Sequence, residues 1–266
     1  MEIINAHAHI YPTKIAEKAT YAIGDFYDIR MQKPAGTTNA LIESGSKIGV
    51  SKYVVHSCAT KPQQVHSINE FIKSELDMHP EFIGFMTLHQ FLTEDEMKKE
   101  IDWALENGFM GVKLHPDFQR FYIDGEDAEK FYRAVGSMGK VFPILLHTGD
   151  NRYEYSKPIR LSRMAEKYPN VTFIGAHFGG YRCWDDYVVY KDLKNVYFDT
   201  SSSLPFINAE KAKEIIDALG YERFFFGDDF PMWDAEEELK RFMRIDIPDE
   251  QKKAILADNI KKLLSL

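Results

Sequence analysis

The sequence predicts an α/β fold, a single (β/α)8 TIM barrel forming one domain over residues 1–266. A chain of this length suits one barrel, which typically takes about 250 residues. Eight short β-branched or aromatic segments are strand candidates, and from the second onward they recur roughly every 25–32 residues, the length of one βα unit. Polar residues end nearly every segment, and no Gly-x-Gly-x-x-Gly motif follows the first, which favours a closed barrel over an open dinucleotide-binding sheet.

The predicted strands are nearly continuous apolar segments, as expected of parallel strands that are covered on both faces. They are Ile3–Ile10, Tyr53–Cys58, Phe82–His89, Met110–His115, Phe142–Thr148, Val171–His177, Val196–Ser201 and Phe224–Asp229. The first connection, residues 11–49, is long enough to carry a short helix or a lid.

Helical patterns fill the remaining connections. Apolar residues recur at amphipathic spacing through Gln63–Met78. Thr93 and Glu96 form a capping box that opens a helix ending at Leu105. The other predicted helices are Gly125–Met138, Lys157–Tyr168, Asn208–Leu219 and Asp249–Leu264.

Composition argues against several classes of partner. With 33 basic and 41 acidic residues the net charge is −8, which argues against a nucleic-acid or anionic-membrane surface. The two cysteines fit no metal or redox motif. No signal peptide and no apolar segment of about 20 residues is visible. We therefore expect a cytoplasmic protein with a small-molecule substrate, and we leave a homo-oligomer open.

A candidate metal site lies at the C-terminal ends of the predicted strands, where barrel enzymes place their active sites. His7 and His9 share one face of the first strand, because side chains alternate along a strand. His147 ends the fifth strand and Asp229 the eighth. Three imidazoles and a carboxylate suit zinc, with manganese or iron as alternatives. The alternative role for Asp229 is to cap the helix that follows it.

Other polar residues flank this predicted site. His177 ends the sixth strand, where it would orient the substrate or polarise its carbonyl group, and Lys113 lies on the fourth strand. The predicted substrate-binding residues are His115, Arg152 and Arg182. A guanidinium suits a substrate carboxylate, although both arginines would serve equally well as solvated loop residues. For Lys113 the alternative is a structural ion pair.

The order of these motifs resembles the amidohydrolase superfamily, specifically its amidohydrolase-2 branch of barrel-fold, metal-dependent hydrolases. The resemblance spans essentially the whole chain, and its pieces are His7–His9, Gly111–Pro116, Leu146–Gly149, Ala176–Gly180, Gly227–Pro231 and the terminal segment Ala257–Leu264. At the eighth strand the chain departs from the family pattern, because Asp228 replaces a small hydroxyl residue. The family's functional aspartate therefore aligns with Asp229, and Asp228 adds a carboxylate.

The resemblance implies roles for these residues. Relatives in this branch usually hold one metal ion, with the strand-six histidine acting in catalysis. Asp229 would ligate the ion and take a proton from the nucleophilic water. In binuclear relatives a carboxylated strand-four lysine bridges two ions, and here Lys113 would do so while His147 and His177 hold the second ion. The predicted catalytic residues are thus Asp229, His177 and Lys113.

The leading functional hypothesis is hydrolysis of a small carboxylate-, amide- or lactone-type substrate through metal-activated water. The alternative is a lyase, a nonoxidative decarboxylase or hydratase of an aromatic or unsaturated carboxylic acid, because relatives with the same ligand set include such enzymes. The chain looks compact beside the decarboxylases, without long insertions after the middle strands, and this favours hydrolysis. A third hypothesis is a non-catalytic metal or ligand binder, but such a binder would have little need for the full set of residues.

Overall fold

The computed structural model describes residues 1–266 and contains eight parallel strands that alternate with helices in sequential order. This is the (β/α)8 barrel fold that the sequence predicts. The residues group into two compact units. Unit 1 comprises residues 1–57, 75–83 and 200–266, and unit 2 comprises residues 58–74 and 84–199. Helix α3 (Val65–Met78) and strand β3 (Phe82–Thr87) contribute residues to both. The organisation as one domain stays a prediction.

Unit 1 holds strands from both ends of the chain. They are β1 (Ile3–His9), β2 (Val50–His56) and β8 (Phe224–Phe225). β1 lies parallel to β2, with His9 opposite His56. On its other side the backbone N–H of Ala6 donates to the carbonyl of Phe226, just past β8, at 2.8 Å. β1 is therefore the central strand of unit 1, and all seven of its residues are buried.

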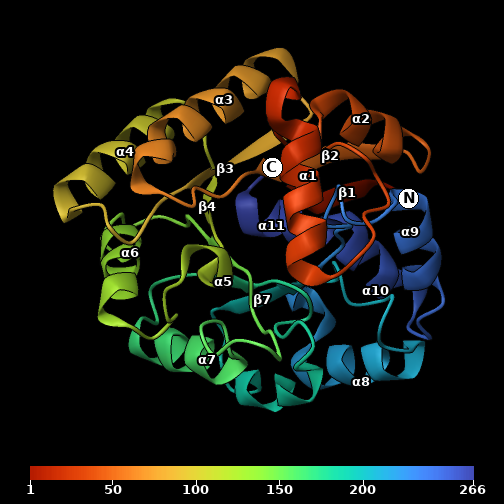
Figure 1. Cartoon of the computed structure of the whole chain (residues 1–266). Coiled ribbons are helices and arrows are strands. Elements are labelled where there is room, and N and C mark those ends of the chain that lie inside the picture. The colour runs from red at the N-terminus through yellow and green to blue at the C-terminus, as the bar shows by residue number, and fades with distance from the viewer. The chain divides into compact units, whose positions relative to one another are not determined.

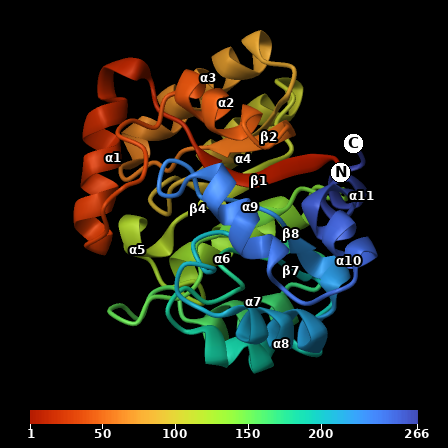
Figure 2. The same cartoon turned by 90° about the vertical axis from the view of Figure 1, so that its right-hand side faces the viewer.

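Unit 1 contains more helices than the sequence predicts (Figure 1). They are α1 (Thr13–Tyr27), α2 (Thr38–Ser46), α8 (Ala209–Leu219), α9 (Ala235–Met243), α10 (Asp249–Lys253) and α11 (Asn259–Leu264). The first connection carries two helices, α1 and α2, and α9 was not predicted. A π-helical turn at residues 254–258 joins α10 to α11, which lie together near β8 (Figure 2). The predicted C-terminal helix is thus confirmed.

Unit 2 contains a run of short parallel strands in tight register. They are β4 (Gly111–Leu114), β5 (Ile144–Leu146), β6 (Phe173–Gly175) and β7 (Val196–Asp199), preceded by β3 from residue 84. Val112 lies opposite Ile144, and Phe173 lies opposite both Ile144 and Val196. Because these strands are parallel and start level, their carboxyl ends meet at one edge. The residues that follow β4, β5 and β6 therefore gather at that edge.

Helices separate most of these strands. They are α4 (Glu94–Glu106), α5 (Pro116–Gln119), α6 (Glu126–Gly136) and α7 (Pro158–Lys167), with most of α3. The capping box before α4 is confirmed: the Thr93 hydroxyl accepts from the backbone N–H of Glu96 at 3.2 Å, and the Glu96 carboxylate accepts from that of Thr93 at 2.7 Å. Only a 3-10 helix, Trp184–Tyr190, joins β6 to β7, so the βα alternation has one exception.

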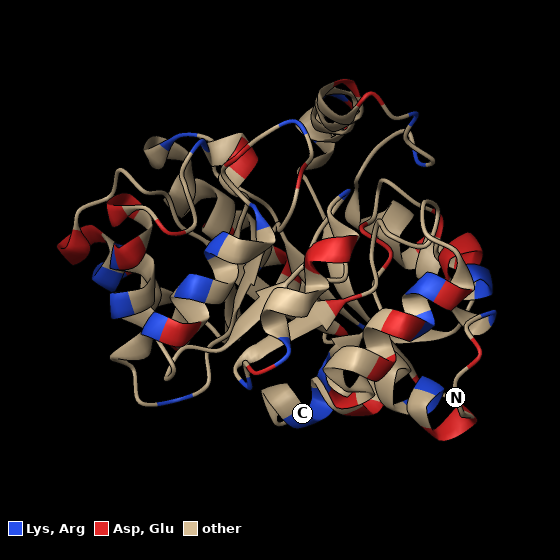
Figure 3. Cartoon of the chain, turned by 90° about the horizontal axis from the view of Figure 1, so that it is seen from below, with Lys and Arg blue, Asp and Glu red and all other residues tan.

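The surface chemistry matches the composition. Lysine, arginine, aspartate and glutamate lie mainly on helices and loops (Figure 3). None of the helices combines the length and apolarity needed to span a bilayer.

Candidate metal centre

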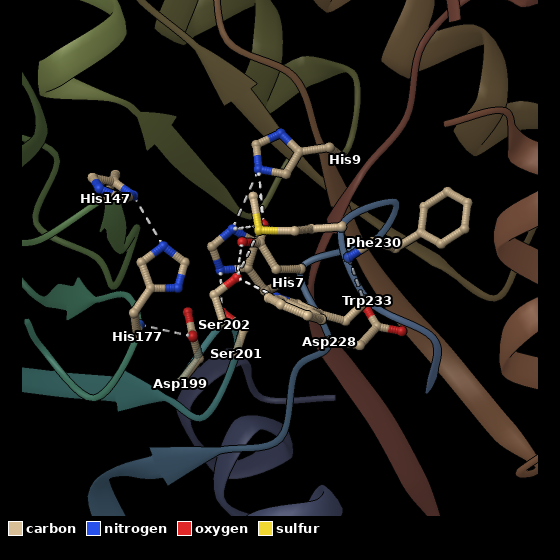
Figure 4. Close-up of polar contacts among 12 residues, drawn as sticks. His7, His9, His147, His177, Asp199, Ser201, Ser202, Asp228, Phe230 and Trp233 are labelled. Atoms are coloured by element: carbon tan, nitrogen blue, oxygen red, sulfur yellow. Dashed lines mark hydrogen bonds and ion pairs between the residues drawn. The ribbon is translucent and has the colours of Figure 1, made fainter. Parts of the chain in front are cut away.

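His7, His9 and Asp229 bring three donor atoms together in unit 1. The two histidines are labelled in Figure 4. His7 Nε2 lies 3.4 Å from His9 Nε2. Asp229 Oδ1 lies 3.3 Å from the former nitrogen and 3.4 Å from the latter. In a tetrahedral zinc site with bonds of about 2.0–2.1 Å, neighbouring ligand atoms are about 3.3 Å apart. The three atoms therefore fit one face of the coordination tetrahedron of a divalent ion.

Backbone geometry holds these side chains in place. His7 and His9 are two residues apart on β1, so they share a face of the strand. The backbone N–H of Asp229 donates to the carbonyl of His7 at 3.0 Å, which ties the segment after β8 to β1. Asp229 is only 6% exposed. A buried carboxylate facing two ring nitrogens needs a compensating cation or proton, and this favours a metal ion at the cluster.

Two serines after β7 contact the atoms of His7 and Asp229 that face away from the donor triangle. Ser201 Oγ lies 3.2 Å from His7 Nδ1, on the far side of the ring from Nε2. Ser202 Oγ donates to Asp229 Oδ2 at 2.5 Å and accepts from Trp233 Nε1 at 2.9 Å. Sequence patterns alone do not single out these serines. The available signal was the polar run Ser201–Ser203 at the end of the seventh predicted strand.

His56 adds a further imidazole to the cluster in unit 1. Its ring packs edge-on against His7 and His9, with 4.9 Å and 4.4 Å between ring centroids. Ring nitrogens of the three histidines all lie within 4.8 Å of one another. This placement follows from the register of β2, which sets His56 opposite His9. In the sequence, His56 shows the same signal as the predicted ligands, because it is a histidine near the end of a predicted strand.

Asp228, the departure from the family pattern, points away from His7 and His9 (Figure 4). Its Oδ1 accepts from Asn5 Nδ2 at 2.7 Å and from the backbone N–H of Phe230 at 2.9 Å, while its Oδ2 has no hydrogen-bond partner. Burial raises the pKa of this carboxyl to about 7, and the nearby carboxylate of Asp229 adds to the rise. Asp228 therefore fixes the turn after β8.

The capping alternative for Asp229 does not hold. The N-cap of α9 is Asp234, whose side chain accepts from the backbone N–H groups of Glu236 and Glu237. Asp229 lies five residues earlier in the chain with a left-handed backbone (φ 55°), facing the histidines of β1. The helix that follows is thus capped without it.

His147 and His177 pair with each other in unit 2 (Figure 4). His147 Nε2 lies 2.9 Å from the carbonyl oxygen of Gly149, which only accepts, so we assign the proton to Nε2. Nδ1 then carries the lone pair and faces His177 Nε2 at 3.0 Å. The backbone N–H of His177 donates to Asp199 Oδ1 at 3.1 Å. As a metal ligand, His147 would therefore use Nδ1.

His115 and Asp117 surround His147. The ring of His115 stacks between Phe118 and His147, at 3.7 Å and 4.1 Å between ring centroids. Asp117 Oδ2 lies 3.5 Å from His147 Nε2 and accepts from the Ser156 hydroxyl at 2.6 Å. Burial raises the pKa of the Asp117 carboxyl to about 7, and this outweighs the hydrogen bond from the serine. These contacts fix the orientation of the His147 ring.

The other predicted residues occupy varied positions in unit 2. Lys113 is fully buried on β4. Arg152 binds the buried carboxylate of Asp150 through two hydrogen bonds, at 3.1 and 2.8 Å. Arg182 is exposed, with its guanidinium over the ring of Tyr181 at 5.4 Å. Donor atoms of Asp117, His147 and Asp150 are close enough to share an ion, but Arg152 already neutralises Asp150. Their substrate-binding and catalytic roles stay predictions.

Comparison with known proteins places this geometry in a family. The amidohydrolase family profile, of the amidohydrolase-2 branch, matches residues 4–266. The chain belongs to this family. A search of curated protein sequences finds no match to this amidohydrolase. Its family is metal-dependent, in agreement with the donor atoms in unit 1.

Solved structures share the fold of this amidohydrolase at low sequence identity. An uncharacterized TIM-barrel protein of Bordetella bronchiseptica has a TM-score of 0.83 at 16% identity, covering 100% of this chain and 99% of its own. The 5-carboxyvanillate decarboxylase of Sphingomonas paucimobilis has a TM-score of 0.77 at 12% identity, covering 100% and 99%. A dihydroxybenzoic acid decarboxylase of Polaromonas sp. with bound manganese has a TM-score of 0.77 at 15% identity, covering 100% and 97%.

Proposed function

We propose that this amidohydrolase is a metal-dependent hydrolase that cleaves a small carboxylate-, amide- or lactone-type substrate with an activated water molecule. The observation that carries the proposal is the triangle of donor atoms from His7, His9 and Asp229, with edges of 3.3–3.4 Å. A divalent ion bound there, zinc first with manganese or iron as alternatives, would lower the pKa of water to about 7 and polarise a carbonyl group. We propose one ion rather than two.

Residues of this chain would bind the ion and transfer the proton. The ion would be held by His7 Nε2, His9 Nε2 and Asp229 Oδ1. The fourth ligand would be His147, which the sequence predicts at the end of the fifth strand, and it would bind through Nδ1. Asp229 would also accept the proton of the attacking water.

Further roles rest on the sequence prediction. His177 would orient the substrate, and Lys113 would take part in catalysis or, when carboxylated, bridge two ions. His115, Arg152 and Arg182 would bind the substrate. The small-molecule substrate and the cytoplasmic location are proposals of the same kind, and a homo-oligomer stays open.

Decarboxylation of an aromatic or unsaturated carboxylic acid is the second candidate, with a hydratase in the same lyase class. It is favoured by structural neighbours that are named as decarboxylases, among them the two described above. On this alternative Asp229 and His177 would act on a ring or a double bond. The compactness of the chain does not separate the candidates, because the match spans 97–99% of each decarboxylase chain.

The test is metal analysis followed by assays with and without the ion. Purified protein should contain a divalent metal, lose activity after chelation and regain it on reloading. Hydrolysis of a lactone should release a proton and hydrolysis of an amide should release ammonia or an amine, whereas a decarboxylase would release carbon dioxide from aromatic acids. Full activity in metal-stripped protein would refute both candidates.

Two histidine variants give a matched comparison in the same assay. We expect His7→Gln to lose the metal, since the substitution removes one donor atom of the triangle. His66→Gln should keep it, because His66 lies on α3 with its side chain 53% exposed. Asp229→Asn should fold normally, bind the metal ion weakly and show no turnover of substrate.

A further inference from the structure

A chain of hydrogen bonds runs through three buried side chains of unit 1 and ends on Asp229. Trp233, Ser202 and Asp229 are 7%, 1% and 6% exposed. We propose that Trp233 and Ser202 are positioning residues that engage one carboxylate oxygen of Asp229 and thereby present only the other to the metal ion. This inference rests on the proposed function, since it concerns the same site.

The direction of each hydrogen bond follows from the groups involved. The indole N–H of Trp233 can only donate, so at 2.9 Å the Ser202 oxygen is its acceptor. The hydroxyl hydrogen of Ser202 must then go to another acceptor. Asp229 Oδ2 lies at 2.5 Å and the sulfur of Met232 at 3.3 Å. The carboxylate oxygen is the closer and stronger acceptor, so the hydrogen points to Asp229.

The two oxygens of Asp229 are therefore inequivalent. Oδ2 receives a charge-assisted hydrogen bond from Ser202, and Oδ1 faces the Nε2 atoms of His7 and His9 at 3.3 and 3.4 Å. To give both oxygens to one ion, the carboxylate would have to bend or break this hydrogen bond. The bond thus favours a single-oxygen ligand, as a four-coordinate site requires.

The residues around Trp233 and Asp229 restrict both ends of this chain of hydrogen bonds. The ring of Trp233 packs edge-on against Phe206 at 5.6 Å, and the guanidinium of Arg241 lies 5.9 Å from the ring centroid. Ser202 and Asp229 both have left-handed backbones, with φ of 49° and 55°. Residues other than glycine are uncommon there, so the two turns retain side chains at some conformational cost.

The test measures metal binding directly, without substrate. Zinc affinity is measured by competition with a chelator for the wild type, Ser202→Ala and Trp233→Phe. The control is Ser203→Ala, because Ser203 is equally buried but donates to the backbone carbonyl of Ser201 at 3.0 Å. We expect Ser202→Ala to bind zinc about 10–100-fold more weakly, since partners that orient a ligand typically contribute that much. Trp233→Phe should show a smaller loss, and the control none.

The visible absorption of cobalt-loaded protein provides a signature that a merely structural role would not move. Four-coordinate cobalt absorbs strongly and sites of higher coordination absorb weakly. We expect the band to weaken in Ser202→Ala, because Asp229 is then free to bind through both oxygens, and to persist in Ser203→Ala. Trp233→Phe carries the comparison by itself should Ser202→Ala fail to fold.

Several outcomes would overturn the inference. The first is wild-type zinc affinity together with an unchanged cobalt spectrum in both Ser202→Ala and Trp233→Phe. The second is a loss of zinc affinity in Ser203→Ala as large as that in Ser202→Ala. The third is a wild-type protein that binds neither zinc nor cobalt. A wild type that binds zinc with the expected ranking of variants, but hydrolyses none of the substrates, would refute the proposed function and leave the positioning role intact.

Discussion

Glu238 is a carboxyl group buried on α9 of unit 1, and we expect its replacement by glutamine to change the pH dependence of stability. Its side chain has no exposed surface and accepts a hydrogen bond from Arg241 at 2.6 Å, while its Oε2 has no partner. Burial raises the pKa of this carboxyl to about 8; Arg241 opposes the rise, and Asp228 and Asp229 add to it.

The sign and size of the effect follow from proton linkage. The pKa is near 4.5 in the unfolded chain and about 8 in the folded one, so folding takes up a proton between these values. The stability that Glu238 contributes is fully present below pH 4.5 and falls by about 1.4 kcal/mol per pH unit until the pH passes 8. From about pH 5 to 7.5 the wild type should lose about 3 kcal/mol relative to Glu238→Gln.

Urea unfolding of the metal-free proteins at several pH values between 5 and 8 measures this difference. Any pH-independent change in the contact with Arg241 shifts the Glu238→Gln curve equally at every pH, so the slope is the informative quantity. The matched control is Glu237→Gln on the same helix, whose side chain is 48% exposed. A difference in unfolding free energy between wild type and Glu238→Gln that stays constant with pH would refute the reasoning.

Three further substitutions test the fold, each by the free energy of unfolding. Gly149→Ala should destabilise by about 2–4 kcal/mol, because φ is 84° and the new Cβ would lie 2.5 Å from the carbonyl carbon of Gly180; a loss below about 0.5 kcal/mol would contradict the contact. Thr93→Ala should cost about 1 kcal/mol by removing the capping box, and no change would show that the cap is dispensable. Asn5→Ala should cost about 1–3 kcal/mol, since Asp228 Oδ1 loses a buried donor; equal stability would show that the Asn5 bond is not needed.

The sequence predicted features that depend on local patterns. The strand segments follow from apolar runs, and the helix after Thr93 follows from its capping box. The proximity of His7 and His9 follows from the alternation of side chains along one strand. His147 and His177 are recognised as candidates because each lies at the end of a predicted strand. Such signals are contained within a few residues, so they can be recognised before any tertiary structure is known.

Features that depend on tertiary contacts were missed. The hydroxyl of Ser202 acquires its role only when Trp233 and Asp229, about thirty residues later, fold against it. α9 was overlooked because its buried positions include Glu238 between Ala235 and Phe242, so a carboxylate stands where an apolar residue would complete the stripe. The direction of the Asp228 side chain likewise depends on its distant donor amide.

The position of β1 between β2 and β8 determines when β1 can complete its strand pairing during translation. The Asn5–Asp228 hydrogen bond spans 223 residues of chain, and His7 meets Asp229 across a similar interval. At a translation rate of about 5–20 residues per second, the amino-terminal strand must wait roughly 10–45 s for its second neighbour to leave the ribosome. Residues 84–199 of unit 2, by contrast, are contiguous and can pair as they emerge. Nascent chains of this amidohydrolase should therefore acquire metal affinity only after residue 229 has left the ribosome.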